Sequence, residues 1–187
     1  VRLETTNAMA WDDIQENLIN FKKPVLVVPG LLGTEMENEN EKLWADLPRM
    51  LVDVGDDFMD PLGFRKNLTA VSEEVYKTEI VKKEPFLDYT DGLLKEFKAQ
   101  GYVENETLFT FPYDWRYGVS GKYADGKTNV DLLGQKIQEI MAQTGSDKVD
   151  VVAHSMGGLL VKKHVANNVA THHVVKGVFV GVPNTGA

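Results

Sequence analysis

The chain has 187 residues, 43% hydrophobic and 26% charged, which fits one globular domain with a real core and is too little for two ordinary ones. Its formal net charge of −8 argues against nucleic-acid binding, because neutralising phosphates requires clustered lysine and arginine. The sequence contains no cysteine, which excludes disulfide bonds, thiolate zinc sites and a cysteine nucleophile.

Runs of apolar residues alternate with helical patterns along the chain. Apolar runs without strict alternation predict strands that are buried on both faces, as in a parallel sheet. Apolar residues at helical spacing, followed by glycine or asparagine, predict helices. In chain order the predicted elements are strand 24–28, helix 91–100, strand 107–111, helix 129–143, strand 149–152, helix 157–168 and a last strand over 174–175 and 177–182. This order predicts a doubly wound, mainly parallel α/β sheet with helices on both faces.

Residues 34–88 interrupt this alternation between the first strand and the first helix. The segment is acidic, yet it contains large apolar residues such as Leu43, Trp44 and Phe58. An insertion of this length in a compact domain is usually functional. Two interpretations remain open: an irregular excursion with its own small cluster, or a lid or cap over a pocket.

The segment VVAHSMGGLL, residues 151–160, places a serine where a strand should pass into a helix. The pattern G-x-S-x-G raises a serine Oγ above the sheet on a strained turn, and small flanking residues let strand and helix approach. Ala153 replaces the first glycine of this pattern. We predict that Ser155 is a nucleophile rather than an incidental serine in a small-residue turn.

A serine nucleophile that attacks an ester creates an oxyanion, which requires preorganised N–H donors. The expected donors are the N–H that follows the nucleophile, here that of Met156, and one from the loop after the first strand. That loop is PGLLG, residues 29–33, and Leu31 is the predicted second donor. Alone, PGLLG would suggest a plain strand-ending turn; its pairing with the serine segment favours the functional interpretation.

Four segments, at residues 24–37, 101–116, 151–160 and 181–187, resemble in order and spacing the lecithin:cholesterol acyltransferase and group XV phospholipase family of α/β hydrolases. The most specific of them contains PYDWR after a predicted strand. The resemblance implies an α/β-hydrolase fold, a Ser-His-Asp triad that uses Ser155, and chemistry on phospholipid or other acyl esters. It also implies a mobile lid and a membrane-contacting region. Candidates for the substrate pocket are Leu32, Trp44, Asp114 and Trp115.

Three features depart from the family pattern: Ala153 in the serine motif, the lack of cysteines for a bridged lid, and the absence of the carboxyl-terminal part. We therefore assign residues 1–187 to a single incomplete α/β-hydrolase domain, with 34–88 as the lid or cap insertion. Asp114 and Arg116 are expected to pair and hold their loop, a structural role favoured over catalysis.

The acid and base of a triad are not expected within this chain. No aspartate or glutamate follows Ser155 in the sequence, although the fold places both partners after the serine. The histidines His154, His164, His172 and His173 are expected to be structural or exposed, and a metal site is rejected. The last strand is predicted to be an exposed apolar edge. We expect a fragment, or a chain whose remainder is supplied elsewhere, that is inactive alone.

The predicted activity is that of a serine acyl hydrolase or acyltransferase that forms an acyl-enzyme on Ser155 with lipid esters. It needs no cofactor, and a peripheral membrane or lipoprotein-like surface is a candidate partner. A simple lipase or carboxylesterase without acyl transfer and a non-catalytic lipid- or partner-binding fragment remain alternatives. The chain begins with Val1 and no signal-peptide pattern follows, so we expect a trimmed amino terminus. Only the family resemblance suggests a secreted or membrane-peripheral location.

Overall fold

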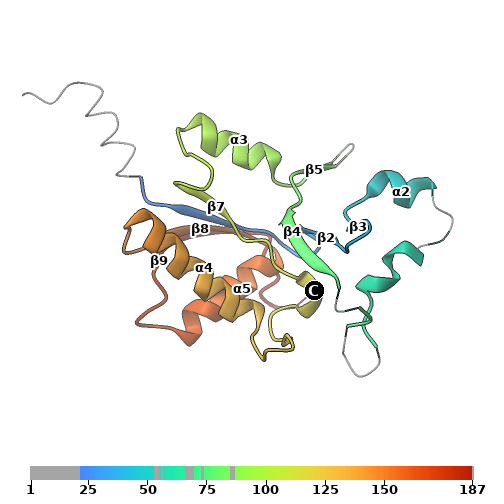
Figure 1. Cartoon of the computed structure of the whole chain (residues 1–187). Helices are drawn as coiled ribbons and strands as arrows, with labels where there is room; N and C mark the ends of the chain where they lie inside the picture. The colour runs from blue at the N-terminus through green and yellow to red at the C-terminus, as the bar shows by residue number, and fades with distance from the viewer. Residues whose placement is uncertain are drawn as a thin grey trace, which may run out of the picture.

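Four parallel strands form the main sheet, in the order β7-β1-β8-β9 (Figure 1). The computed structural model describes residues 22–52, 55, 57–65, 70–72, 74–84 and 87–186. The strands of the sheet are β1 (Val25–Val28), β7 (Leu108–Thr110), β8 (Val149–His154) and β9 (Val174–Val180). The prediction of a mainly parallel α/β sheet is confirmed.

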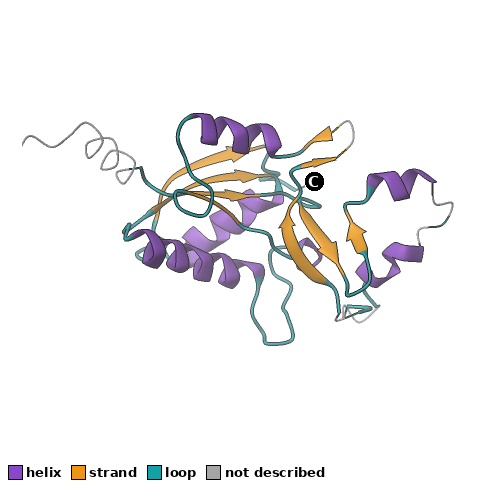
Figure 2. Ribbon diagram, turned by 45° about the horizontal axis from the view of Figure 1, so that its top comes forward, coloured by secondary structure: helices purple, strands orange, loops and turns teal. Residues whose placement is uncertain are grey.

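Helices cover both faces of this sheet, with α3 on one face and α4 and α5 on the other (Figures 1 and 2). The helices are α3 (Asp91–Ala99), α4 (Asn129–Thr144) and α5 (Met156–Asn167). Strand β1 shows why its sequence is apolar throughout: Val25 and Val27 pack with Leu94 of α3, whereas Leu26 and Val28 join the core formed with α4 and α5. A strand that is buried on both faces carries apolar residues at successive positions, so its sequence does not alternate between apolar and polar residues.

The helix α4 begins and ends at clear sequence signals. The Thr128 side chain accepts a hydrogen bond from the Asp131 N–H, and the Asp131 carboxylate accepts one from the Thr128 N–H, which forms a capping box. Gly145 follows the helix with a φ of 69°, a left-handed conformation that glycine adopts without strain. These signals determine where α4 begins and ends.

Part of the insertion folds into a three-stranded antiparallel sheet, in the order β3-β2-β4. Figure 2 shows this sheet beyond the carboxyl ends of the parallel strands. Met36, Leu43, Trp44 and Val81 belong to a buried cluster of its own. The elements of the insertion are β2 (Thr34–Glu37), β3 (Lys42–Trp44), α2 (Leu47–Val52), η1 (Asp57–Leu62), β4 (Tyr76–Ile80), β5 (Lys83–Glu84) and β6 (Leu87–Asp88), of which β5 and β6 form a hairpin.

Strand β9 is the edge of the parallel sheet next to β8. It is one continuous strand that includes Lys176, which the prediction left out, and it ends at Val180 rather than at the predicted residue 182. The Lys176 N–H donates to the Asp150 carboxylate. Val178 is 56% exposed and Val180 is 50% exposed, which confirms the prediction of an exposed apolar edge.

Candidate functional site

Ser155 is the single residue between the end of β8 and the start of α5. Its φ of 48° is unusual for a residue other than glycine, and such strained conformations persist where the surrounding structure enforces them. The Ser155 N–H donates to the Val180 carbonyl (2.9 Å), and the Ser155 carbonyl accepts from the Gly158 N–H (3.0 Å). These bonds fix the turn on both sides of the half-buried serine.

Two glycines allow the turn after β1 to lie against the serine turn. A Cβ at Gly30 would come within 2.8 Å of the Ser155 Cβ, and a Cβ at Gly157 would overlap the Pro29 carbonyl oxygen. Neither position has room for a side chain. By contrast, Ala153 is fully buried and pairs with Val28 and Phe179 in the sheet, so a methyl group fits where the motif usually has glycine.

Residues 30–33 form a tight turn closed by a hydrogen bond from the Gly33 N–H to the Gly30 carbonyl (3.1 Å). Leu32 has a φ of 62°, and the Leu31 side chain is 55% exposed. Among the described residues, no hydrogen bond uses the N–H of Leu31 or that of Met156. The two predicted oxyanion donors therefore lie on turns that pack together at the serine and have unused hydrogen-bonding capacity.

Three aromatic side chains hold the backbone around this turn. The Tyr113 hydroxyl donates to the Pro29 carbonyl (3.1 Å), the Trp44 indole N–H to that of Leu32 (2.7 Å), and the Trp115 indole N–H to that of Thr34 (3.0 Å). The two indole rings meet edge to face, with centroids 6.2 Å apart. The structure thus brings together three of the four predicted pocket residues, Leu32, Trp44 and Trp115.

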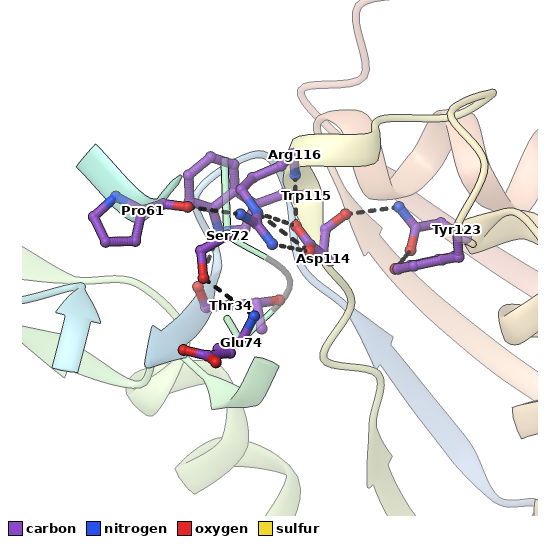
Figure 3. A network of polar contacts seen from close by, with 9 residues as sticks. Thr34, Pro61, Ser72, Glu74, Asp114, Trp115, Arg116 and Tyr123 are labelled. Atoms are coloured by element: carbon purple, nitrogen blue, oxygen red, sulfur yellow. Dashed lines mark hydrogen bonds and ion pairs between the residues drawn. The ribbon is translucent and has the colours of Figure 1, made fainter. Parts of the chain in front are cut away.

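The fourth pocket candidate, Asp114, is engaged in an ion pair. Its carboxylate accepts from Arg116 Nη2 at 2.7 Å and from Arg116 Nε at 2.9 Å, and both side chains are buried (Figure 3). Arg116 Nη1 also donates to the Pro61 carbonyl (3.3 Å), and the Asn129 amide donates to the Asp114 carbonyl (2.8 Å). The predicted pairing of Asp114 with Arg116 is confirmed, and the bond from Arg116 to Pro61 connects the insertion to the loop after β7.

Asp114 and Arg116 also line a cavity of about 530 Å³. Its walls include Tyr117 and Tyr123, whose rings lie 4.5 Å apart. Burial raises the pKa of Tyr123, which keeps its hydroxyl protonated as a donor to the Asn129 side chain (2.6 Å). The polar groups of Asp114 and Tyr123 in this wall are thus already engaged by Arg116 and Asn129.

The histidines occupy separate surroundings. His164 is buried on α5 beside Gly134 of α4, its Nε2 lies 3.1 Å from the His172 carbonyl oxygen, and burial lowers its pKa. His173 Nδ1 lies 3.3 Å from the Asp147 carbonyl oxygen. His154 is exposed beside Gly30 at the carboxyl edge of the sheet. The environment of His164 fits a structural role.

Tyr113, Thr34 and Asn129 are not among the residues predicted for the site. The Thr34 hydroxyl accepts from the Tyr113 N–H (3.1 Å), and Asn129 joins the carbonyls of Asp114 and Gly118. Tyr113 lies within the segment PYDWR, the one sequence signal that pointed toward it. In the part of the chain that the structure describes, no helix is long and apolar enough to cross a membrane.

A serine on a strained strand-to-helix turn, beside a loop that follows the first parallel strand, is the arrangement that α/β hydrolases use. The family model described as lecithin:cholesterol acyltransferase matches residues 60–187 of this chain. The chain therefore belongs to the lecithin:cholesterol acyltransferase family.

Curated relatives carry names from the same family. The lecithin-cholesterol acyltransferase-like 4 protein of Arabidopsis thaliana is 27% identical, over 74% of this chain and 29% of that protein. The phosphatidylcholine-sterol acyltransferase of Homo sapiens is 26% identical, over 76% of this chain and 38% of that protein. The lecithin-cholesterol acyltransferase-like 1 protein of Arabidopsis thaliana is 31% identical, over 39% of this chain and 18% of that protein. The chain thus spans about a third of the length of the first two relatives.

Proposed function

We propose that this chain provides the nucleophile and the oxyanion donors of an enzyme that transfers or hydrolyses the acyl groups of phospholipid-like esters. The observation that carries the proposal is the strained backbone of Ser155, packed against a turn whose Leu31 N–H makes no hydrogen bond with any residue that the structure describes. Membership in the family and the names of the relatives, which specify lecithin or phosphatidylcholine, support the substrate class.

In the proposed reaction, the Ser155 Oγ attacks the ester carbonyl carbon while a histidine base takes its proton. The N–H groups of Leu31 and Met156 stabilise the oxyanion, and one such donor typically contributes about 2.7–4 kcal/mol. The tetrahedral intermediate expels the alcohol of the ester, which receives the proton, and leaves an acyl group on Ser155. Water or a second alcohol then takes the acyl group, which gives hydrolysis or transfer.

The base and the acid are proposed to come from a part of the protein outside this chain, because no aspartate or glutamate follows Ser155 here. Strand β9 supports this proposal, since its apolar side chains lie exposed at the edge of the sheet, where a further strand can pair and cover them. We propose that the chain is inactive without those residues.

The insertion, residues 34–88, is proposed to act as a cap over the acyl-binding pocket. Its Trp44 contacts both Trp115 and the turn that contains Leu32, so it lies beside the proposed oxyanion donor. Leu32, Trp44 and Trp115 would then form an apolar wall of the pocket. Asp114 would border the same pocket while its carboxylate remains paired with Arg116.

The test is covalent labelling of the longer protein that contains this chain with a fluorophosphonate probe. Labelling should occur on Ser155 and disappear in Ser155→Ala. Ser146→Ala is the matched control, because its hydroxyl bonds to the Lys148 carbonyl in the loop before β8. Labelling that persists in Ser155→Ala, or lipid binding without any hydrolysis, would contradict the proposal and favour a non-catalytic lipid-binding protein.

A second measurement separates acyl transfer from hydrolysis. Products are compared with and without a long-chain alcohol as acceptor, at equal phospholipid concentration. A new ester that depends on the alcohol supports an acyltransferase. Free fatty acid as the only acyl product under both conditions, beside the deacylated lipid, supports a lipase or carboxylesterase.

A further inference from the structure

The turn that carries Leu31 is held by groups outside itself. Leu31 is 55% exposed, so packing of its own side chain gives the turn little support. Leu32 adopts a φ of 62°, which is unfavourable for a leucine and must be enforced by the surroundings. The side chains that enforce it come from two distant segments of the chain, at residues 44 and 113.

Hydrogen bonds fix three of the four carbonyl groups from Pro29 to Leu32. The Pro29 carbonyl accepts from the Tyr113 hydroxyl, the Gly30 carbonyl from the Gly33 N–H, and the Leu32 carbonyl from the Trp44 indole. A peptide unit is planar, so a fixed carbonyl also fixes the N–H on its other side. The Leu31 N–H shares a peptide plane with the Gly30 carbonyl, which accepts from the Gly33 N–H. The bond from Tyr113 fixes the preceding plane, between Pro29 and Gly30. The bond from Trp44 fixes the plane between Leu32 and Gly33.

Tyr113 is itself held rigidly. It is fully buried, its ring stacks on Phe111 with centroids 5.8 Å apart, and its N–H donates to the Thr34 hydroxyl. Burial raises the pKa of its hydroxyl, which therefore stays protonated and remains a donor throughout the ordinary pH range. A phenylalanine could fill the same space, so the hydroxyl is the group that this position specifically supplies.

We propose that Tyr113 and Trp44 are positioning residues that aim the Leu31 N–H at the oxyanion formed on Ser155. The inference rests on the proposed function, because it gives that N–H a role only if Ser155 is the nucleophile. It adds to the site two residues that act through the carbonyls of Pro29 and Leu32 and need not touch the substrate. Trp44 would then have a second role beside that of pocket wall.

The deciding variant is Tyr113→Phe in the active protein that contains this chain. We expect kcat, and the rate of inactivation by a fluorophosphonate, to fall about tenfold, while KM is unchanged. This loss is smaller than the ~10²–10³-fold fall in kcat that removal of a whole oxyanion donor causes, because the Leu31 N–H is still present. Rates are normalised to titrated active sites, so that unfolded protein does not contribute. Trp44→Phe should lower the inactivation rate in the same direction. Thr144→Val is the control, because it also removes a hydroxyl donor to a backbone carbonyl, that of Ile140, but at the end of α4, and both rates should stay at the wild-type level.

The possible outcomes separate this inference from the proposed function. A Tyr113→Phe protein with unchanged kcat and inactivation rate overturns the inference while wild-type labelling leaves the nucleophile in place. A raised KM at unchanged kcat, or a lower melting temperature without a rate change per active site, also overturns it in favour of a pocket or purely structural role. A wild-type protein that does not label at all overturns the proposed function, and this inference with it.

Discussion

The parallel sheet and the antiparallel insertion are built on different principles. All four residues of β1 are buried between helices, and the glycine contacts at the serine turn leave no room for one more carbon atom. Strand β2 of the insertion alternates between buried and partly exposed residues, and Lys42 forms ion pairs there with Glu35 and Glu84. Close packing thus defines the position of Ser155, whereas the insertion has its own small core and partly exposed ion pairs. Residues 113–116 form one of the contacts between the two regions.

The largest effect is expected where the two regions are joined. Asp114→Ala would leave the Arg116 guanidinium buried without its partner, because the two side chains are 7% and 3% exposed. Removing one partner of a buried ion pair costs about 3–5 kcal/mol of unfolding free energy. Urea denaturation of the purified protein measures this loss.

A double variant shows whether the pair or only the orphaned charge is responsible. Asp114→Ala combined with Arg116→Met should be less destabilised than Asp114→Ala alone, since no buried charge remains uncompensated. The double variant should still loosen the insertion, because Arg116 no longer bonds to the Pro61 carbonyl. An Asp114→Ala protein as stable as the wild type would show that the two regions are held together by other contacts.

Matched leucines test whether the two regions unfold as one unit. Leu133 of α4 and Leu43 of β3 are both fully buried, one in each core. Replacement of either by alanine is expected to cost about 2–5 kcal/mol. We expect Leu133→Ala to accelerate hydrogen exchange throughout the parallel sheet and Leu43→Ala to accelerate it mainly within residues 34–84. Equal acceleration in both regions for both variants would contradict the division into two units.

Two glycines at equivalent helix positions test the close approach at the serine. Gly157 and Gly92 are the second residues of α5 and α3. A methyl group at Gly157 would meet the backbone carbonyls of Pro29 and Val28, and overpacking of this kind typically costs about 1–3 kcal/mol. At Gly92 it would meet only the end of the flexible Asp88 side chain, so that Gly92→Ala should be neutral or stabilising, as helix propensity favours alanine by up to about 1 kcal/mol. Thermal melts of the two variants provide the comparison.

The same contrast explains what the sequence could predict. The apolar runs and the helix ends of the parallel region carry local signals: Thr128 and Gly145 cap α4 as their residue types suggest. The serine motif and the PGLLG turn are also local, and the pairing of Asp114 with Arg116 needs only two residues of separation. In each of these features, the residues that interact are also close together in the sequence.

The antiparallel sheet and the aromatic contacts have no such local signal. Strands β2 and β3 are 4 and 3 residues long, too short for a clear period of alternation. The bond from Tyr113 to the Pro29 carbonyl spans 84 positions, and a tyrosine in a buried segment does not reveal where its hydroxyl points. Strand β9 was predicted over residues 174–175 and 177–182 without Lys176; the strand includes that residue, whose N–H bonds to the Asp150 carboxylate.

The smallest expected effect is a pH dependence that belongs to the parallel region alone. Burial holds the pKa of His164 below its ordinary value of 6.5, so the folded state favours the neutral ring more than the unfolded state does. The stabilisation by this group is therefore present above pH about 6.5 and is lost as the pH falls through the folded pKa, with a slope of at most about 1.4 kcal/mol per pH unit. Urea denaturation at a series of pH values should show this slope in the wild type and a flatter one in His164→Gln.

Hydrogen exchange should show where this stability is lost at low pH. We expect faster exchange in α4 and α5, which pack on each other at His164 and Gly134, and unchanged exchange in residues 34–84. An identical pH dependence in the wild type and His164→Gln would assign the effect to other groups.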